Sequence, residues 1–226
     1  MIAAILTDIE GTTTSLSFVK DILFPYARSR LAEFVHSHKD NIDVRRILDE
    51  VNTVCSKQYD DEQLIAQLMR WIDEDQKITP LKTLQGLIWE TGYRKGDFYG
   101  HVYTDAVRKL HEWHGAGIAL YIFSSGSVQA QKLLFGHTEH GDLNPIFSGN
   151  FDTNIGAKQE AESYRKIAGE IGFAASEILF LSDIRAELDA ARVAGMKTCL
   201  LVRDAQAADS GSHLHAQNFD GILFTV

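Results

Sequence analysis

The sequence predicts an α/β protein in which a parallel sheet core is interrupted by an inserted helical domain. In the second half of the chain, short continuous apolar runs alternate with helix-like patterns, as expected for strands that are covered on both faces. One further apolar run stands alone at the N-terminus, and a long stretch of helical periodicity follows it. We therefore expect an α/β core domain over residues 1–16 and 101–226 and a helical cap domain over residues 17–100.

The candidate strands are short and rich in Ile, Leu, Val and Phe. Five such runs are present: Ala3–Leu6, Leu120–Phe123, Ile178–Leu181, Thr198–Val202 and Ile222–Phe224. Between the later runs, apolar residues recur every three or four positions, which predicts helices around residues 128–135, 164–171 and 188–194. Alternation of strand and helix is typical of a Rossmann-like parallel sheet.

The segment that follows the first strand has only helical periodicity. Four amphipathic patterns cover residues 22–34, 44–51, 64–72 and 84–88, which predicts a helical insertion of about four elements. The stretch Glu90–Tyr103 contains three glycines and is interpreted as the linker that returns to the core. The polar stretch Ala205–Gln217 is predicted to be a surface loop.

The composition excludes several classes of protein. The 226-residue chain carries a formal net charge of −9 and has no run of basic residues, which argues against a nucleic-acid or anionic-membrane surface. Its two cysteines, Cys55 and Cys199, are too few for a disulfide framework. The N-terminus lacks the features of a signal peptide, and no apolar stretch approaches the roughly 20 residues of a membrane span. We expect a cytoplasmic protein.

Reactive or hydrogen-bonding side chains follow three of the predicted strands. Asp8 follows the first, Ser124 and Ser125 follow the second, and Ser182 and Asp183 lie at the end of the third. In open α/β sheets, ligands bind outside the carboxyl ends of the strands. If these strands are parallel and adjacent, the side chains converge on one site.

The acidic residues of this set suit metal-assisted phosphoryl chemistry. Asp8 and Asp183 would repel each other unless a cation lay between them, and oxygen ligands with room for water suit Mg²⁺. With its charge neutralised by the metal, a phosphoryl group can be attacked by Asp8 as nucleophile. Glu10 lies two residues further on, on the same side of an extended chain, where it can act as a proton donor to the leaving oxygen.

Phosphate recognition is predicted at two other places. Ser124, Ser125 and the amides of Gly126 and Ser127 lie between a strand and a helix, where they can bind phosphate oxygens. Lys158 lies just before the next helix. Its ammonium group could balance negative charge on both the phosphoryl group and Asp8.

Four motifs in this order carry a family resemblance: "TDIEGT", "FSSGS", "GAK" and "LFLSD". They resemble the motifs of the haloacid dehalogenase superfamily of aspartate-dependent phosphohydrolases. The blocks "TTSLSFVKDILFPYAR", "LQGLIWETGY", "HVYTDAV", "YIFSSGSVQAQKLLFGH" and "LFLSDIRAELDAARVAGM" extend the resemblance along most of the chain to the bifunctional enolase-phosphatases (acireductone synthases) of methionine salvage.

The resemblance implies a fold, a reaction and a set of site residues. The expected substrate is 2,3-diketo-5-methylthiopentyl-1-phosphate, which is first enolised and then dephosphorylated to an acireductone. By match to the motifs, Asp8 and Glu10 are catalytic residues, Ser124, Ser125 and Lys158 bind substrate phosphate, and Asp8, Glu10 and Asp183 hold one Mg²⁺ per chain. We expect a monomer, because no long exposed apolar helix remains once core and cap are assigned.

Each of these residues also has a simpler interpretation. The two acids around Ile9 could form a solvated strand-end turn, the serine pair could only cap a helix, and Lys158 could be a surface lysine. Asp183 could be the N-cap of the following helix. Glu187, four residues further on, could orient Asp183 or the metal-bound waters, or it could be merely solvated or structural.

Two other functions remain open at the level of sequence. The first is a phosphatase of the same superfamily that acts on another small phosphate ester without enolisation. The second is a non-enzymatic ligand-binding protein on the same fold, against which the complete set of acids and Lys158 argues. A dehalogenase also uses a strand-end aspartate, but the serine pair and the acidic metal site favour phosphoryl chemistry. The histidines have no zinc-like spacing and are assigned to surface and loop positions, except that the role of His101, in the predicted linker, is left open.

Overall fold

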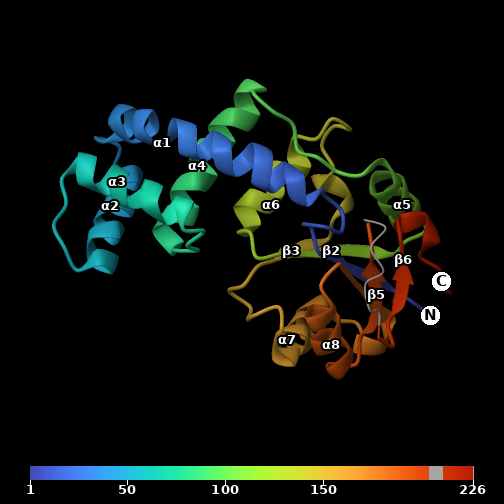
Figure 1. Cartoon of the computed structure of the whole chain (residues 1–226). Coiled ribbons are helices and arrows are strands. Elements are labelled where there is room, and N and C mark those ends of the chain that lie inside the picture. The colour runs from blue at the N-terminus through green and yellow to red at the C-terminus, as the bar shows by residue number, and fades with distance from the viewer. Residues whose placement is uncertain (204–210, 226) are drawn as a thin grey trace. The chain divides into compact units, whose positions relative to one another are not determined.

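The computed structural model describes residues 1–203 and 211–225 (Figure 1). The chain forms two compact units. Met1–Leu16 and Gly100–Val226 make up the first, and Ser17–Tyr99 make up the second. Each unit has its own hydrophobic core.

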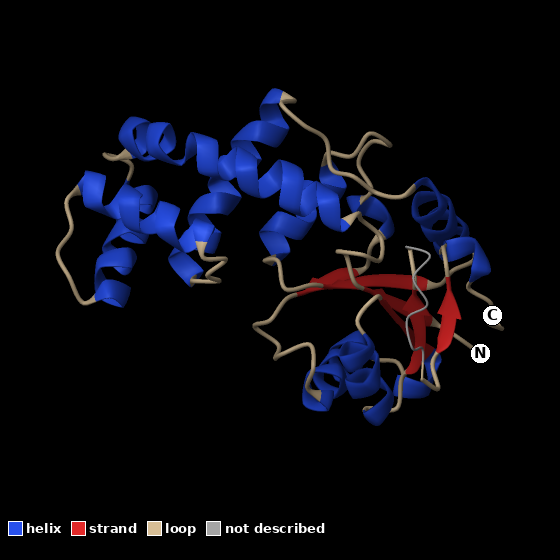
Figure 2. Cartoon of the chain, viewed as in Figure 1, coloured by secondary structure: helices blue, strands red, loops and turns tan. Residues whose placement is uncertain are grey.

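The first unit is built on a six-stranded sheet in the order β3-β2-β1-β4-β5-β6 (Figure 2). All five strand pairs are parallel. The strands are β1 (Ala4–Thr7), β2 (Ala119–Phe123), β3 (Gly149–Phe151), β4 (Ile178–Ser182), β5 (Lys197–Leu201) and β6 (Leu214–Ala216). The N-terminal strand β1 is central, and its Thr7 lies opposite Ile122 of β2 and Leu181 of β4. The predicted fold class is therefore confirmed.

Helices cover both faces of this sheet. Figure 1 shows α5 (Thr104–Gly115) and α6 (Val128–Gly136) on one face, and α7 (Ala161–Ile171) and α8 (Arg185–Val193) on the other. Short 3-10 turns occur at Asn144–Ile146, Ala175–Glu177 and Phe219–Gly221. β1 and β4 are buried along their whole length, which is why their sequences are continuous apolar runs rather than alternating ones.

Four of the five predicted strands are present, and the fifth is wrong. Ile222–Phe224 is not a strand. Ile222 is buried, Phe224 packs on Trp113 with ring centroids 5.6 Å apart, and Leu223 is exposed. The edge strand is instead β6, within the stretch predicted to be a surface loop; residues 205–210 of that stretch lie outside the described residues. The other edge strand, β3, was not predicted. Both edge strands are only three residues long, too short to give an apolar run.

The second unit is helical. Its elements are a π-helical turn, η1 (Phe18–Leu23), and the helices α1 (Phe24–His38), α2 (Ile42–Cys55), α3 (Asp61–Asp73) and α4 (Thr79–Lys95). Asn41 and Asp60 cap α2 and α3 through side-chain oxygens, as expected for these residue types. Leu31, Leu48 and Leu64, from three different helices, are fully buried in a common core.

The predicted linker Glu90–Tyr103 is wrong in its first half, because α4 continues to Lys95. Gly92 lies inside this helix, where a Cβ atom would come within 2.5 Å of the Phe98 ring and 2.8 Å of the Tyr26 ring. Here glycine allows close ring packing and does not end a helix. The helix ends at Gly96, whose φ of 73° is left-handed.

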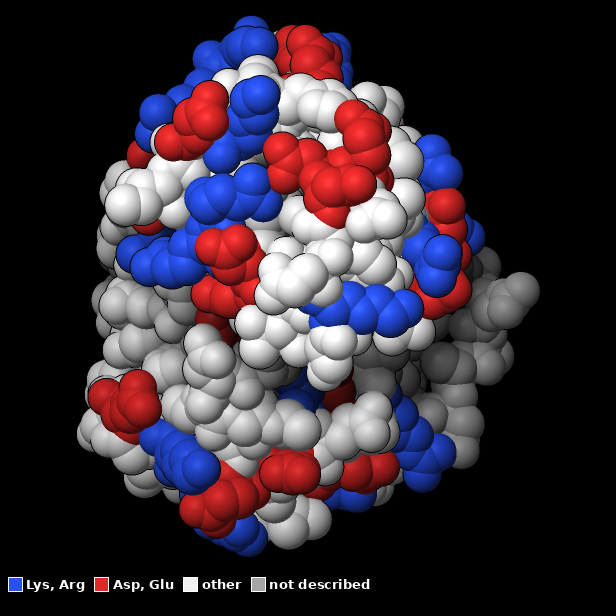
Figure 3. Space-filling model, turned by 90° about the vertical axis from the view of Figure 1, so that its left-hand side faces the viewer, with Lys and Arg blue, Asp and Glu red and all other residues white. Residues whose placement is uncertain are grey.

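The surface and the cysteines agree with the expectations from composition. On the face shown in Figure 3, acidic and basic side chains lie interspersed. Cys55 and Cys199 are both free. None of the helices in the described ranges is long and apolar enough to cross a membrane. One histidine departs from its assignment: His213 is buried and hydrogen-bonds Thr198 and Asp189.

Candidate active site

Asp8 lies at the carboxyl end of the central strand. Its backbone N–H donates to Leu181 O of β4 at 2.9 Å, which continues the sheet pairing by one residue. The residue is only 4% exposed. Since β2 and β4 flank β1, the residues that follow these three strands meet at one edge of the sheet, as the sequence predicts.

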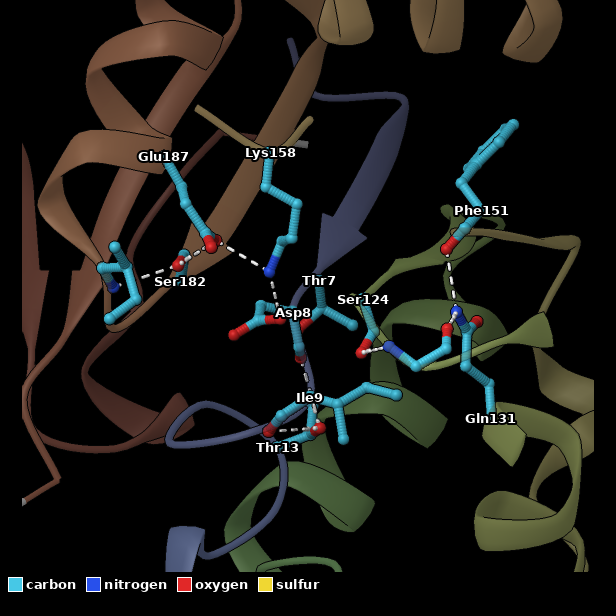
Figure 4. A network of polar contacts seen from close by, with 12 residues as sticks. Thr7, Asp8, Ile9, Thr13, Ser124, Gln131, Phe151, Lys158, Ser182 and Glu187 are labelled. Carbon is cyan, nitrogen blue, oxygen red and sulfur yellow. Dashed lines mark hydrogen bonds and ion pairs between the residues drawn. The ribbon is translucent and has the colours of Figure 1, made fainter. Parts of the chain in front are cut away.

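Lys158 forms a buried ion pair with Asp8 (Figure 4). Its Nζ lies 2.5 Å from Asp8 Oδ1 and 2.8 Å from Glu187 Oε2. The backbone carbonyl of Lys158 accepts a hydrogen bond from Tyr164 Oη at 2.7 Å, which holds the backbone at this position. Burial lowers the pKa of Lys158, but the two carboxylates outweigh it and raise that pKa above its usual value. Lys158 is thus a buried, charged group beside Asp8, and its interpretation as a surface lysine is wrong.

Glu187 is buried, so its interpretation as a solvated side chain is also wrong. Its Oε2 accepts a hydrogen bond from Ser182 Oγ at 2.9 Å in addition to the ion pair with Lys158. Burial, and after it the charge of Asp8, raises the pKa of Glu187. From the sequence, Asp183 was a possible partner of Glu187, but the structure shows a contact with Lys158. Spacing along a helix indicates which residues share a face, and it does not identify the residue that packs against that face.

Asp183 is the acid whose chemistry most clearly indicates a bound cation. Its Oδ1 is buried without a hydrogen-bond partner. Burial, and after it the nearby Asp8 carboxylate, raises the pKa of Asp183 to about 7. An unpartnered buried oxygen facing a second carboxylate is costly unless a positive charge compensates it.

The chain folds tightly around the Asp183 carboxylate in the turn from Asp8 to Thr14. Gly11 has a left-handed φ of 75°, and a Cβ atom there would lie 2.2 Å from Asp183 Oδ2. Only glycine therefore fits at this point. The carbonyl of Ile9 accepts hydrogen bonds from three successive amides, those of Thr12, Thr13 and Thr14. Glu10 lies within this turn with an exposed side chain.

The loop after β2 is arranged as a hydrogen-bonding cradle. Ser124 is 4% exposed, and its Oγ accepts a hydrogen bond from Gly126 N at 3.1 Å. Ser125 is exposed. Ser127 is the residue that caps α6, by accepting from Ala130 N at 3.2 Å. The residue that caps the helix is thus Ser127, and the interpretation of Ser124 and Ser125 as the helix cap is wrong.

Gln131 supports this loop and was missed as a site residue, since its position had been assigned only to the buried face of a helix. It is 1% exposed, and its Nε2 donates to Gly126 O at 2.9 Å and to Phe151 O at 2.8 Å (Figure 4). Its Oε1 accepts from Asn150 Nδ2 at 3.1 Å. A fully hydrogen-bonded buried amide of this kind holds a loop in one conformation. A buried Gln on an otherwise apolar helix face is the sequence signal that could have revealed it.

The donor set fits a magnesium ion in part. Among the residues the structure describes, no three His, Cys, Asp or Glu side chains are grouped closely enough to form a complete metal cage. Asp8 and Asp183 nevertheless follow the adjacent strands β1 and β4, and Asp183 Oδ1 is buried without a hydrogen-bond partner. Mg²⁺ usually binds one or two carboxylates and completes its shell with water and substrate phosphate, so two carboxylates suffice.

Comparison with known proteins gives full-length matches. The family model for haloacid dehalogenase-like hydrolases matches residues 2–195. The chain is 62% identical over 223 residues to "Enolase-phosphatase E1" of Methylococcus capsulatus, covering 98% of each chain. It is 58% identical over 222 residues to the protein of the same name from Thioalkalivibrio sulfidiphilus, covering 98% of this chain and 99% of that one.

Solved structures give the same result at the level of the fold. The UTR4 protein of Saccharomyces cerevisiae superposes with a TM-score of 0.84 at 36% identity, covering 98% of this chain and 100% of that chain. CbbY from Rhodobacter sphaeroides, in complex with phosphate, superposes with a TM-score of 0.60 at 16% identity, covering 97% and 95%. The second likeness concerns the fold alone.

Proposed function

The chain belongs to the haloacid dehalogenase-like hydrolase family, and on that basis we propose that it is an enolase-phosphatase. It converts 2,3-diketo-5-methylthiopentyl-1-phosphate to the acireductone 1,2-dihydroxy-3-keto-5-methylthiopentene and phosphate, in methionine salvage. High identity over nearly the whole length to proteins named enolase-phosphatase supports this activity. The observation that carries it in the structure is the buried Asp8–Lys158 pair at the end of the central strand.

The metal ion belongs to this proposal. Asp8 and Asp183 would hold one Mg²⁺, and Glu10 completes the set of ligands expected from the motifs. The ion would supply positive charge that offsets repulsion between an anionic nucleophile and an anionic phosphoryl group. The unpartnered Asp183 Oδ1 and its raised pKa support this assignment.

In the phosphatase step, Asp8 is the nucleophile. One of its carboxylate oxygens attacks phosphorus, the bond between phosphorus and the substrate oxygen breaks, and Glu10 gives a proton to that leaving oxygen. Water then attacks the aspartyl-phosphate, Glu10 takes the proton of the water, and phosphate leaves with Asp8 restored. Lys158 pairs with Asp8 and orients its carboxylate, while Ser124 and Ser125 bind phosphate oxygens.

In the enolase step, a proton leaves the carbon that bears the phosphate ester, and the neighbouring carbonyl oxygen gains a proton. The ammonium of Lys158 can stabilise negative charge on that oxygen as it develops. We assign Glu10 a part in the proton movement of both steps, because its carboxylate lies in the turn beside Asp8 and reaches one methylene further than aspartate would. The helical unit of residues 17–99 is proposed to act as the cap domain that selects the substrate.

The decisive experiment follows both reactions in one cuvette. Purified protein, Mg²⁺ and the diketo phosphate are mixed, and enol absorbance and free phosphate are recorded together. We expect an enol signal followed by stoichiometric phosphate, with Asp8→Asn losing phosphate release while it retains enolisation. If the diketone stays untouched while simple phosphate esters are hydrolysed, the protein is instead a phosphatase of another substrate.

The state of the protein in the cell is part of the same proposal. We propose a cytoplasmic monomer that acts on a small phosphorylated molecule. Large apolar side chains that are exposed in the described chain, such as Ile22, Ile42 and Val193, are distributed over different helical elements, which supports a monomer. Sedimentation equilibrium at micromolar concentration tests it.

A further inference from the structure

Arg203 follows β5 and reaches the turn that carries Glu10. Its guanidinium donates two hydrogen bonds to a single acceptor, Thr12 O, from Nε at 3.0 Å and from Nη2 at 2.7 Å. Thr12 is fully buried. A charged donor pair on a buried carbonyl is a stronger anchor than an ordinary backbone hydrogen bond.

The guanidinium is itself fixed from the opposite side. Its Nη1 lies 2.9 and 2.7 Å from the two carboxylate oxygens of Asp105. Asp105 in turn accepts a hydrogen bond from Phe219 N at 2.8 Å. The guanidinium carbon lies 4.0 Å from the ring centroid of Tyr103 and 5.2 Å from that of Phe219. The Arg203 side chain is only 10% exposed, so ion pair, ring contacts and hydrogen bonds act together in a partly dry site.

Arg203 thus holds the turn at Thr12, whereas Asp8 is held mainly by other residues. Asp8 is held by the sheet, through Leu181 O, and by Lys158. The turn beyond it is held by Arg203 at Thr12 O and by Tyr103 N at Thr13 O. Nucleophile and turn therefore have largely different supports, and one hydrogen bond links them directly, from Thr13 Oγ1 to Asp8 O at 3.2 Å.

We propose that Arg203 is a positioning residue for the turn that carries Glu10. This inference rests on the proposed role of Glu10 in proton transfer, and it adds a residue outside all four recognised motifs. Arginine suits this position because its planar guanidinium holds several donors in a fixed fork that reaches Thr12 O and both oxygens of Asp105, whereas the compact ammonium of lysine lacks this fixed geometry. Loss of the fork should disturb proton donation by Glu10 more than attack by Asp8.

Leaving groups of different basicity separate these two effects. Expulsion of p-nitrophenolate needs little protonation, whereas an alkoxide needs a proton from a general acid, a contribution on the order of 10²–10⁴-fold. For Arg203→Lys we expect kcat/KM to fall roughly 10- to 100-fold on an alkyl phosphate and by less than about 3-fold on p-nitrophenyl phosphate. Equal losses on the two esters would overturn the proposal, because a general loss of folding affects both alike.

Arg108→Lys is the matched control. Arg108 also joins α5 to the 3-10 turn after Asn218, through Asp220, and it pairs with Glu112 of its own helix, but its side chain is half exposed. This variant should keep both kcat/KM values. If Arg203→Lys does not fold, Asp105→Asn replaces it, and the same selective loss is expected at smaller size.

Hydrogen exchange supplies a readout that does not depend on activity. The amides of Thr12, Thr13 and Thr14 all bond to Ile9 O, and their exchange should become at least several-fold faster in Arg203→Lys but not in Arg108→Lys. Unchanged exchange in this peptide would overturn the proposal even if no substrate were turned over. If the wild type hydrolyses simple esters but not the diketone, the proposed substrate is wrong and the test of Arg203 still holds.

Discussion

Replacement of Asp183 by asparagine should stabilise the metal-free protein. Asp183 and Asp8 are two carboxylates in one partly buried site, and together with burial this raises the pKa of Asp183 from an ordinary 3.8 to about 7. A shift of about 3 units corresponds to about 4 kcal/mol at 1.36 kcal/mol per unit. Since the residue is only partly buried, solvent screening reduces this, and we expect Asp183→Asn to gain about 1–2 kcal/mol at pH 8.

The sign of the pH dependence follows from proton binding. Between about pH 4 and pH 7 the folded chain holds a proton on Asp183 that the unfolded chain has lost, so the stability of the wild type falls as the pH rises through this window. Above pH 7 Asp183 is ionised in the folded chain as well as in the unfolded chain, so the full destabilisation by its charge is present. The advantage of Asp183→Asn should therefore be near zero at pH 4 and largest above pH 7.

Thermal unfolding in EDTA measures this difference. For a chain of this size, 1–2 kcal/mol corresponds to an increase in Tm of about 2–8 °C at pH 8. Saturating Mg²⁺ should reverse the order, because the ion stabilises only the wild type, by about 2.7 kcal/mol at 100 times its Kd. A variant that is no more stable than the wild type in EDTA at pH 8 would refute the reasoning.

Three further variants test the supports of the site. Gly11→Ala places a Cβ atom against the Asp183 carboxylate at a left-handed φ. We expect a loss of roughly 1–3 kcal/mol in stability and weaker Mg²⁺ binding, measured by calorimetric titration. Unchanged binding would contradict the close approach of Gly11 to Asp183. Gln131→Met removes the donor to Gly126 O and one of the two donors to Phe151 O, which keeps its bond from Ser124 N. This should cost about 1–3 kcal/mol in stability and raise KM for phosphate esters several-fold, whereas an unchanged KM would show that the loop keeps its conformation without Gln131. Lys158→Met leaves the buried carboxylates of Asp8 and Glu187 without their cation and should cost about 3–5 kcal/mol in stability, measured by chemical denaturation. The double variant with Glu187→Gln should recover part of this loss. A further loss in the double variant would argue against the ion pair between Lys158 and Glu187.

Much of the fold could be predicted because strand burial leaves a clear pattern. Runs such as Ala3–Leu6 and Ile178–Leu181 are apolar on both faces because they lie in the middle of the sheet. The edge strands β3 and β6 leave no such pattern, since they are short and partly exposed. Gly92 misled the prediction because a glycine that admits a neighbouring ring and a glycine that ends a helix look the same in sequence.

Some features of the candidate site could likewise be predicted from the sequence, and others could not. Convergence of Asp8, Ser124 and Asp183 could be expected, because all three follow strands of one parallel sheet. The contacts of Glu187, Gln131 and Arg203 could not, because each depends on which element packs opposite, and periodicity describes only the residue's own element. Sequence patterns indicate the position of a residue along its own strand or helix. The residue that it contacts on another element is known only from the packed structure.

The central place of β1 has a consequence for how the chain acquires its structure during synthesis. Ala4 pairs with Ala119 and with Ile178, so the strand that leaves the ribosome first must wait for partners made much later. At 5–20 residues per second, the last of β4 follows β1 by roughly 10–35 s. The helical unit Ser17–Tyr99 needs no such distant partner, since its core is made from its own helices. We therefore expect this unit to fold first, while an apolar N-terminal segment stays exposed as a binding site for chaperones until the sheet closes around it.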